Sequence, residues 1–202
     1  MNVSIRQWAV RYSVVIFALL GLSCGQALAG QSAMDHDHYY WTALAHAHYI
    51  EAGRSGPIIY DFMDPNCPYC HRLYQRLQKP IQEGKLRVRF IVVGVLTPSS
   101  RPKAATILSA THPLVALQKN EAGFSMTARG PEGGITPATA SVIASVRNAL
   151  DFNTSRLSGK ESELLGLGGV GVPFLVWRSG AKLHYVYGPP SESQWKMLLQ
   201  AS

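Results

Sequence analysis

The sequence predicts an α/β fold in which helices are inserted between the second strand and a later strand that opens at Val172-Pro173. Three observations predict it. A short apolar strand runs directly into a helical segment, a second strand follows, and two apolar runs near the end are joined by Ser179-Gly180, which is typical of a hairpin. A strand–helix unit followed by a hairpin fits the rules for packing helices on a sheet. With 47% hydrophobic and 15% charged residues among 202, the chain can build a core and is not a disordered type.

Residues 1–29 read as a secretory signal rather than as part of the fold. Arg6 and Arg11 supply a positive start, Val14–Leu22 form a short apolar stretch, and Ala27-Leu28-Ala29 offers small residues around a cleavage site. We therefore expect export and cleavage near Ala29. An uncleaved anchor is the alternative, although the apolar stretch is short for a bilayer.

The cysteines point to chemistry rather than to structural crosslinking. Of three cysteines, Cys24 leaves with the signal unless it carries a lipid, so the mature chain keeps Cys67 and Cys70. A ring closed over two intervening residues constrains the unfolded chain very little. Removing Arg6 and Arg11 lowers the net charge from +7 to +5, and no aromatic residues interleave with a basic stripe, so we expect no nucleic-acid partner.

The first part of the mature chain alternates helical and extended patterns. Residues 30–56 are expected to form an N-terminal segment with a linker helix, and residues 57–202 the catalytic domain. The expected elements are, in order, a helix over His36–Ala52, a strand over Pro57–Met63, a helix from Pro68 to about Gln78 closed by Pro80, and a strand over Leu86–Leu96.

The second part contains the insertion, expected over about 97–169. Its predicted helices are Lys103–Ala122, Pro137–Leu150 and Glu161–Leu167, with a loop at Gly130–Thr136. Strands over Val172–Arg178 and Lys182–Tyr187 form the hairpin, and Ser191 can cap a final helix. This order matches the thioredoxin fold with helices inserted before its third strand.

Cys67 lies at the strand-to-helix turn, immediately before Pro68 at the first helical position. Proline suits that position because its missing N–H would have no helical partner. The free N–H groups and positive helix end lower the pKa of the Cys67 thiol, which makes it the expected attacking sulfur. Cys70, one turn along, is expected to resolve the mixed disulfide by forming a Cys67–Cys70 bond.

Other interpretations of the same residues stay open. Cys67-Pro-Tyr-Cys-His71 also fits the attachment motif for c-type haem, with His71 as iron ligand, in which case the chain would be a small cytochrome. A non-catalytic module that binds unfolded chains is a third class. One cysteine pair is too few for structural zinc, so we expect no metal site.

At these residues a family resemblance can be stated. Asp64-Pro-Asn-Cys-Pro-Tyr-Cys-His71 resembles the active-site segment of periplasmic disulfide isomerases of the DsbC/DsbG type, within which the DsbG group is the most similar. Gly84-Lys85-Leu86 and Val92-Val93-Gly94-Val95 continue the likeness, and Trp41 with His48-Tyr49-Ile50 resembles the family's linker helix. The likeness covers about residues 38–202 and does not include the family's N-terminal dimerisation domain.

The resemblance implies thiol:disulfide exchange in the periplasm without a bound cofactor. Its expected partners are unfolded or mis-oxidised exported proteins and a membrane redox protein, and we expect a monomer. Val172-Pro173 resembles the cis-proline pair that faces the dithiol, where a cis bond frees the preceding backbone to pair with substrate. Val172 occupies the position before the proline at which DsbC and DsbG carry threonine. In this respect the sequence resembles the oxidase DsbA. Tyr69 is compatible with oxidation, reduction or isomerisation.

Asp61 lies six residues before Cys67, where thioredoxin has a buried acid. A buried Asp61 would have a raised pKa and could accept the Cys70 proton; the alternative is an outward-facing side chain. His71 either adds positive charge near the thiolate or faces solvent.

Overall fold

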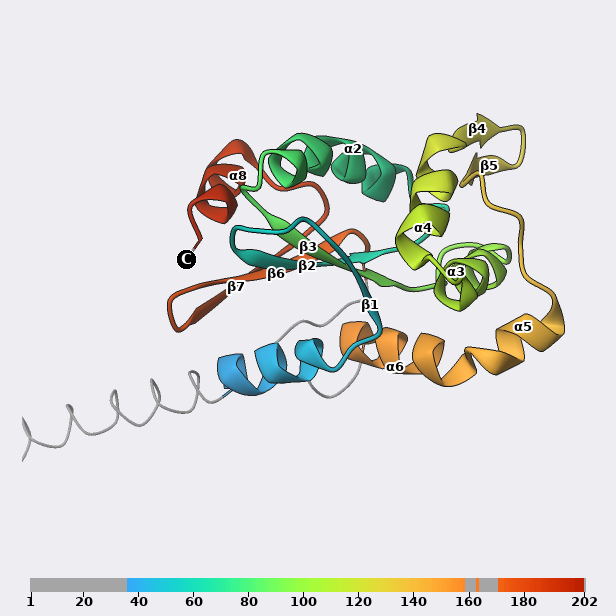
Figure 1. The fold of residues 1–202 in the computed structure, drawn as a ribbon, viewed down its shortest axis with the longest axis horizontal. Helices are drawn as coiled ribbons and strands as arrows, with labels where there is room; N and C mark the ends of the chain where they lie inside the picture. The colour runs from blue at the N-terminus through green and yellow to red at the C-terminus, as the bar shows by residue number, and fades with distance from the viewer. Residues whose placement is uncertain (1–35, 159–162, 164–170, 202) are drawn as a thin grey trace, which may run out of the picture.

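A computed structural model describes residues 36–158, 163 and 171–201, and its centre is a five-stranded sheet with strand order β1-β3-β2-β6-β7 (Figure 1). The strands are β1 (Tyr49–Ala52), β2 (Ile58–Met63), β3 (Arg87–Val92), β6 (Phe174–Ser179) and β7 (Lys182–Tyr187). Only β2 and β3 pair in parallel, and the other neighbours are antiparallel. The prediction of an α/β fold with a hairpin after the insertion is confirmed.

The middle strand β2 is buried on both faces and so divides the core into two layers. Ile59 and Met63 pack toward α2 (Pro68–Gln82) and α8 (Glu192–Leu199). Tyr60 and Phe62 point to the opposite side, where a helix over residues 36–45 and α6 (Arg147–Ser158) cover the sheet (Figure 1). Because strand side chains alternate, this arrangement assigns Asp61 to the α2 side.

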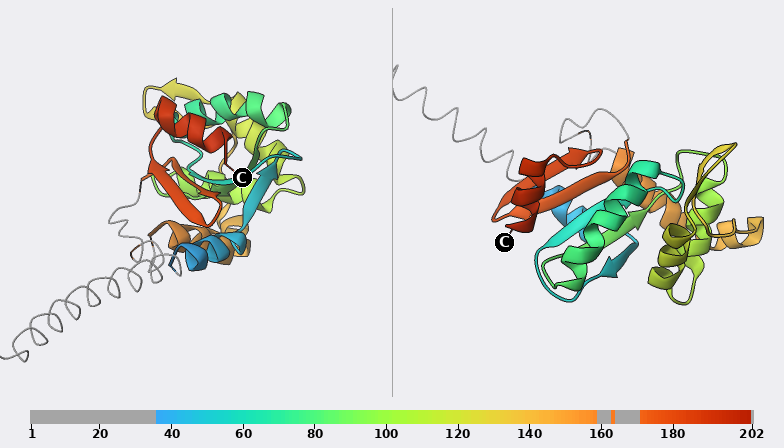
Figure 2. Two further views of the ribbon diagram at one scale, coloured as in Figure 1. Left: turned by 90° about the vertical axis from the view of Figure 1, so that its left-hand side faces the viewer. Right: turned by 90° about the horizontal axis from the view of Figure 1, so that it is seen from above.

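The insertion forms a subdomain at one end of the sheet, beside the N-terminal end of α2 (Figures 1 and 2). Its described elements are α3 (Ser100–Ser109), α4 (Pro113–Ala122), β4 (Ser125–Thr127), β5 (Gly130–Glu132) and α5 (Ala140–Ser145), followed by α6. The short strands β4 and β5 pair with each other and not with the main sheet.

Two predicted helices are wrong in part. The predicted helix His36–Ala52 stops at residue 45, and Tyr49–Ala52 forms β1, which pairs with β3. Aromatic and β-branched residues at 49–50 favour extended backbone once a neighbouring strand offers partners, a long-range effect that local spacing does not report. The predicted helix Lys103–Ala122 is two helices, broken before Pro113, where proline disfavours helical backbone at the preceding residue.

Three further boundaries differ from the prediction. Helix α2 does not close at Pro80 but continues to Gln82, with Pro80 in its last turn. The predicted helix Pro137–Leu150 is split between α5 and α6, and the first residues of the predicted loop Gly130–Thr136 form β5. Strand β3 ends at Val92, not at Leu96, because the following segment turns toward Asp64.

The predicted signal at 1–29 and the predicted helix Glu161–Leu167 lie outside the described residues. Within the described ranges, no helix combines the length and apolar character needed to cross a membrane.

Candidate functional site

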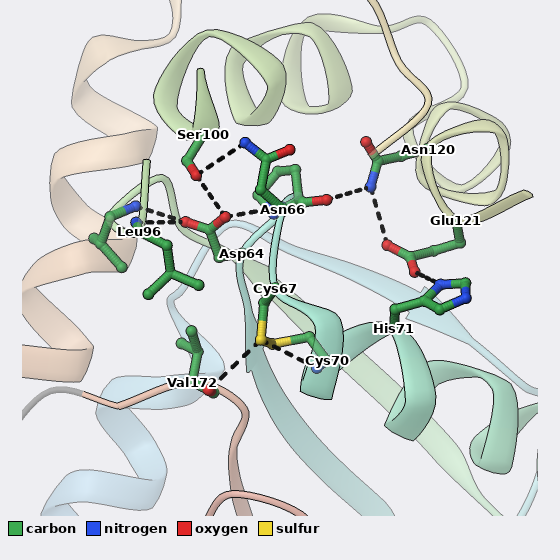
Figure 3. The surroundings of a disulfide bond; sticks show 12 residues. Asp64, Asn66, Cys67, Cys70, His71, Leu96, Ser100, Asn120, Glu121 and Val172 are labelled. Atoms are coloured by element: carbon green, nitrogen blue, oxygen red, sulfur yellow. Dashed lines mark hydrogen bonds and ion pairs between the residues drawn. A yellow bond between two sulfur atoms is a disulfide. The ribbon is translucent and has the colours of Figure 1, made fainter. Parts of the chain in front are cut away.

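Cys67 and Cys70 are joined by a disulfide at the N-terminal end of α2 (Figure 3). Cys67 is the N-cap residue of that helix, with extended backbone, and Pro68 follows at the start of the helix. The Cys70 N–H donates to Cys67 Sγ over 3.1 Å, and the His71 N–H donates to the Cys67 carbonyl over 3.0 Å. The sulfur of Cys67 therefore occupies the place of a capping oxygen, where N–H dipoles favour negative charge.

The two sulfurs are largely covered. Cys70 is fully buried and Cys67 is 2% exposed, whereas Tyr69 between them is 51% exposed. A reacting sulfur must approach Cys67 along the disulfide axis, so the side chains and backbone next to Cys67 have to admit it.

The Val172–Pro173 peptide bond is cis and lies opposite the disulfide. The Val172 carbonyl oxygen is 3.6 Å from Cys67 Sγ, the two groups facing each other in Figure 3. Pro173 is held in turn by the Gly188 N–H, which donates to its carbonyl over 2.8 Å. Two segments about a hundred residues apart in sequence thus meet at one sulfur.

The loop between β2 and α2 is fixed by Asp64, whose buried carboxylate accepts four hydrogen bonds. One oxygen accepts from the Val95 and Leu96 N–H groups at 2.7 and 3.0 Å. The other accepts from the Asn66 N–H at 2.9 Å and from Ser100 Oγ at 2.6 Å. Satisfying both oxygens in this way stabilises a buried carboxylate and orients the backbone that leads into Cys67.

Asn66 extends this network into the insertion. Its amide oxygen accepts from Lys103 Nζ at 3.1 Å and from the Gly133 N–H at 3.0 Å, while its amide nitrogen donates to the Ser99 hydroxyl at 2.8 Å. Lys103 is 3% exposed and also donates to the Gly133 carbonyl over 2.7 Å. Gly133 lies so close that a Cβ there would overlap the Asn120 amide and the Pro65 carbonyl.

The sequence interpretation missed this network. Asp64 and Asn66 were part of the motif, but nothing in the spacing indicated that their partners are Ser100, Lys103 and Gly133. Lys103 is the one residue whose type could have indicated it, because a lysine on the buried side of a helix needs polar partners.

Asp61 is fully buried, so its side chain faces inward, toward α2. Neither of its carboxylate oxygens has a hydrogen-bond partner among the described residues. Burial, and secondarily the charge of Glu121, holds the pKa of Asp61 well above its usual range. A buried carboxylate without a hydrogen-bond partner does not stabilise the fold.

The His71 ring is turned away from the sulfurs, toward Glu121 on α4 (Figure 3). Nδ1 is 2.8 Å from Glu121 Oε2, Nε2 is 2.9 Å from the Gln75 amide nitrogen, and the ring stacks on Phe124 with centroids 4.4 Å apart. The solvent-facing alternative for His71 is wrong, since its side chain is only 17% exposed. Both ring nitrogens are occupied by side chains of this chain, which argues against His71 as a haem ligand.

A shallow hollow of about 280 Å³ adjoins the tetrapeptide. Its lining comes from α2 and from the segment before α8, and consists of Tyr69, Arg72, Leu73, Arg76, Pro189 and Pro190. The guanidinium of Arg72 lies over the Tyr69 ring at 4.6 Å, and that of Arg76 pairs with Glu192. Elsewhere in the described part of the chain, no three histidine, cysteine or acidic side chains gather closely enough to hold a metal.

The thioredoxin-like domain family matches residues 44–201. Two curated relatives are named thiol:disulfide interchange protein DsbG. The protein of Escherichia coli K12 is 34% identical over 84 residues, which is 41% of this chain and 34% of that protein. The protein of Pseudomonas aeruginosa PAO1 is 29% identical over 106 residues, covering 52% and 41% respectively.

The matched regions thus span less than half the length of these curated relatives. Among solved structures, Helicobacter pylori DsbG is similar with a TM-score of 0.55 and 20% identity, over 80% of this chain and 70% of that chain. Proteus mirabilis ScsC in a transitional conformation is similar with a TM-score of 0.56 and 18% identity, over 96% and 93%. At such identities these structures establish the shared fold.

Proposed function

This chain belongs to the thioredoxin-like domain family, and we propose that it is a thiol:disulfide oxidoreductase of the DsbG-like group that acts on exported proteins in the periplasm. The observation that carries the proposal is the Cys67–Cys70 pair at the N-terminus of α2, opposite the cis Val172–Pro173 bond. A buried pair kept only for stability would gain little from so small a ring.

In the oxidising direction, a substrate thiolate attacks Cys67 of the disulfide. A bond forms between the substrate sulfur and Cys67 Sγ, and the Cys67–Cys70 bond breaks with the electron pair going to Cys70. A second substrate thiolate then attacks the mixed disulfide, so that the substrate is oxidised by two electrons and the dithiol of Cys67 and Cys70 is left reduced. Reduction of a substrate disulfide is the same sequence reversed, beginning with the Cys67 thiolate.

Cys67 is the attacking sulfur in the reduced protein because it caps α2, where the N–H groups and helix dipole favour its thiolate. Cys70 is the resolving sulfur. Its thiol must lose a proton as it attacks the mixed disulfide, and Asp61 is the acceptor we assign to that proton.

Substrate contact falls to the surface around Cys67. Val172 presents backbone beside the sulfur, and Pro173 sets its direction. Tyr69 and the hollow next to it offer an open apolar and basic surface for residues that flank a substrate cysteine. Unfolded or mis-oxidised exported proteins suit such a surface, because their chains are extended enough to pair with exposed backbone. A membrane redox partner would restore the dithiol or disulfide after each cycle.

The proposal is tested with an aromatic disulfide that releases a coloured thiolate. The reduced protein, carrying Cys24→Ser so that only Cys67 and Cys70 react, is mixed with one equivalent and followed by absorbance and intact mass. Two thiolates should be released in sequence, leaving the internal disulfide. Cys70→Ser should release one thiolate and retain one adduct on Cys67, and Cys67→Ser should react far more slowly.

A Cys67→Ser variant that reacts as fast as the parent would overturn the order of attack. If the parent shows no turnover and the Cys67→Ser variant holds unfolded chains as well as the parent does, the non-catalytic binding module is favoured instead. A visible haem band would establish the cytochrome.

A further inference from the structure

One face of α2 leads away from the dithiol and forms one wall of the shallow hollow of about 280 Å³. The α2 residues of this wall are spaced three or four positions apart and therefore lie on the same side of the helix. The other wall is the segment before α8. The lining residues are Tyr69, Arg72, Leu73 and Arg76 from α2, and Pro189 and Pro190 from that segment. Because Tyr69 stands between the two cysteines, the hollow begins at the dithiol.

The wall before α8 is also connected to the reactive sulfur. Pro189 follows Gly188, whose N–H donates to the Pro173 carbonyl over 2.8 Å. Pro173 follows Val172, whose carbonyl oxygen is 3.6 Å from Cys67 Sγ. One hydrogen bond therefore joins the backbone beside the sulfur to the wall of the hollow, and a substrate chain that leaves Cys67 on this side meets the hollow.

The two arginines of the hollow differ in whether their charge is paired. The Arg76 guanidinium is 2.7 Å from a carboxylate oxygen of Glu192 and lies 4.0 Å from the centre of the Trp195 ring. Arg72 is exposed, and its guanidinium lies over the Tyr69 ring at 4.6 Å. Among the described residues, no carboxylate lies within ion-pair distance of Arg72. Arg72 thus presents an unpaired positive charge, held against an aromatic ring, in the turn of α2 that follows the dithiol.

A group of this kind favours a carboxylate. The guanidinium is planar, and its N–H donors match the two oxygens of a carboxylate. The stacking on Tyr69 restricts the guanidinium before any substrate binds, so less freedom is lost on binding. Arg72 follows Cys67 by five residues, a rise of about 7.5 Å along the helix, while an extended chain advances about 3.3 Å per residue. A side chain two or three residues from the substrate cysteine can therefore reach Arg72.

We propose that Arg72 is a specificity-determining residue, and that the protein prefers substrates with aspartate or glutamate two or three residues from the reacting cysteine. The inference rests on the proposed function. In the step concerned, the Cys67 thiolate attacks the cysteine sulfur of a substrate disulfide and forms a bond with it. The other sulfur of that disulfide leaves as a thiolate with the bonding electron pair. The substrate carboxylate pairs with Arg72 as the substrate approaches and remains paired in the mixed disulfide.

The test uses peptides whose single cysteine forms a disulfide with an uncharged pyridyl thiol, so that release of thiopyridone reports attack by Cys67. Aspartate is placed two or three residues before or after the cysteine, and matched peptides carry asparagine at the same position. The reduced protein carries Cys24→Ser and Cys70→Ser, and intact mass verifies that the peptide is bound to Cys67. Each ratio of aspartate to asparagine rate constants is divided by the ratio measured with mercaptoethanol, which corrects for the reactivity of the peptide itself.

The corrected ratio should be about two- to fivefold at one or more of these positions, the range of an exposed ion pair, and should approach one at high salt. Arg72→Gln should abolish the preference, and Arg72→Glu should invert it. Because each ratio is measured on one protein, any effect of residue 72 on the Cys67 thiolate cancels.

Arg129→Gln is the matched control, because it removes the same charge from an 85% exposed arginine in the insertion. Its ratio should equal that of the parent. A corrected ratio of one at every position, or a preference that survives in Arg72→Gln, would overturn the inference. An equal loss in Arg129→Gln would also overturn it, since the preference would then reflect net charge. If no peptide forms an adduct with Cys67, the proposed function itself fails.

Discussion

Asp61 and Asp64 are both buried and stand three positions apart, yet Asp64 accepts four hydrogen bonds while neither oxygen of Asp61 has a partner among the described residues. The strand carries Asp61 into an apolar layer beneath α2, and the loop carries Asp64 among backbone N–H groups. The same carboxylate therefore destabilises the fold at position 61 and stabilises it at position 64. This contrast leads to opposite predictions for the same substitution.

Asp61→Asn should stabilise the disulfide form increasingly as pH rises. Because the folded-state pKa of Asp61 is raised, the native state binds its proton more tightly than the unfolded chain does. The free energy of unfolding therefore falls from about pH 4, the unfolded value, up through the folded pKa, by up to about 1.4 kcal/mol per pH unit. Asparagine does not ionise, so the free energy of unfolding of the variant should not show this decrease.

Urea unfolding of parent and variant at several pH values between about 4 and 8 measures the difference. The control is Asp151→Asn, whose carboxylate is 57% exposed and pairs with Arg101 at the surface. A difference in the free energy of unfolding between Asp61→Asn and its parent that stays constant over this pH range would contradict the prediction.

Asp64→Asn should destabilise the protein by about 2 to 4 kcal/mol at neutral pH, since an amide group would turn donors toward buried donors. Asparagine keeps one oxygen, so its NH2 group would face either the Val95 and Leu96 N–H groups or the Asn66 N–H and the Ser100 hydroxyl. Urea unfolding gives the magnitude, and faster hydrogen exchange at the Val95 and Leu96 amides or at the Asn66 amide would show which side loses its acceptor. A variant as stable as its parent would show that the loop does not depend on this carboxylate.

Lys103→Met should cost about 1 to 3 kcal/mol, because the methionine keeps the apolar stem but leaves the Gly133 carbonyl without its Lys103 donor. Lys119→Met on α4 is the matched control. Its side chain is exposed, so the expected change is within about 0.5 kcal/mol. If Lys103→Met is more stable than the parent, the desolvation of the Lys103 ammonium on folding costs more free energy than its hydrogen bonds contribute.

His71→Leu and Glu121→Leu should each destabilise the protein, and the double variant should lose less than the sum of the two. Each single change leaves one polar group of the pair buried without its main partner. We expect a coupling of about 1 to 3 kcal/mol in a double-mutant cycle based on thermal or urea unfolding. Additivity to within about 0.5 kcal/mol would show that the pair does not act as a unit.

Much of the fold could be predicted because local patterns coincide with tertiary structure. The strand β2, the start of α2 at Pro68 and the hairpin through Gly180 have strong local signals: an apolar run, a helix-initiating proline and a two-residue turn. The cap of α8 was equally local, and Ser191 forms a capping box with Gln194. Each needs only residues close in sequence.

The remainder depends on contacts between distant segments. Tyr49–Ala52 is extended because β3 offers it an edge, and the partner of His71 lies 50 residues away on α4. The Asn66–Lys103 contact likewise joins a loop to a helix 37 residues away in sequence, and local spacing does not report that contact. A pattern of residue types can identify the dithiol, but not the polar groups that surround it.

Gly133 shows how closely the inserted subdomain is fitted to the loop before Cys67, since its backbone bonds Asn66 and Lys103 and leaves no room for a side chain. Chimeras built by transplanting an insertion from another family member should therefore fail unless the donor brings both a glycine at this point and a lysine that reaches the Asn66 amide of the recipient loop. A substitution in the loop before Cys67 therefore restricts the substitutions that the inserted subdomain can accept, and the reverse also holds. The two segments should change together in evolution.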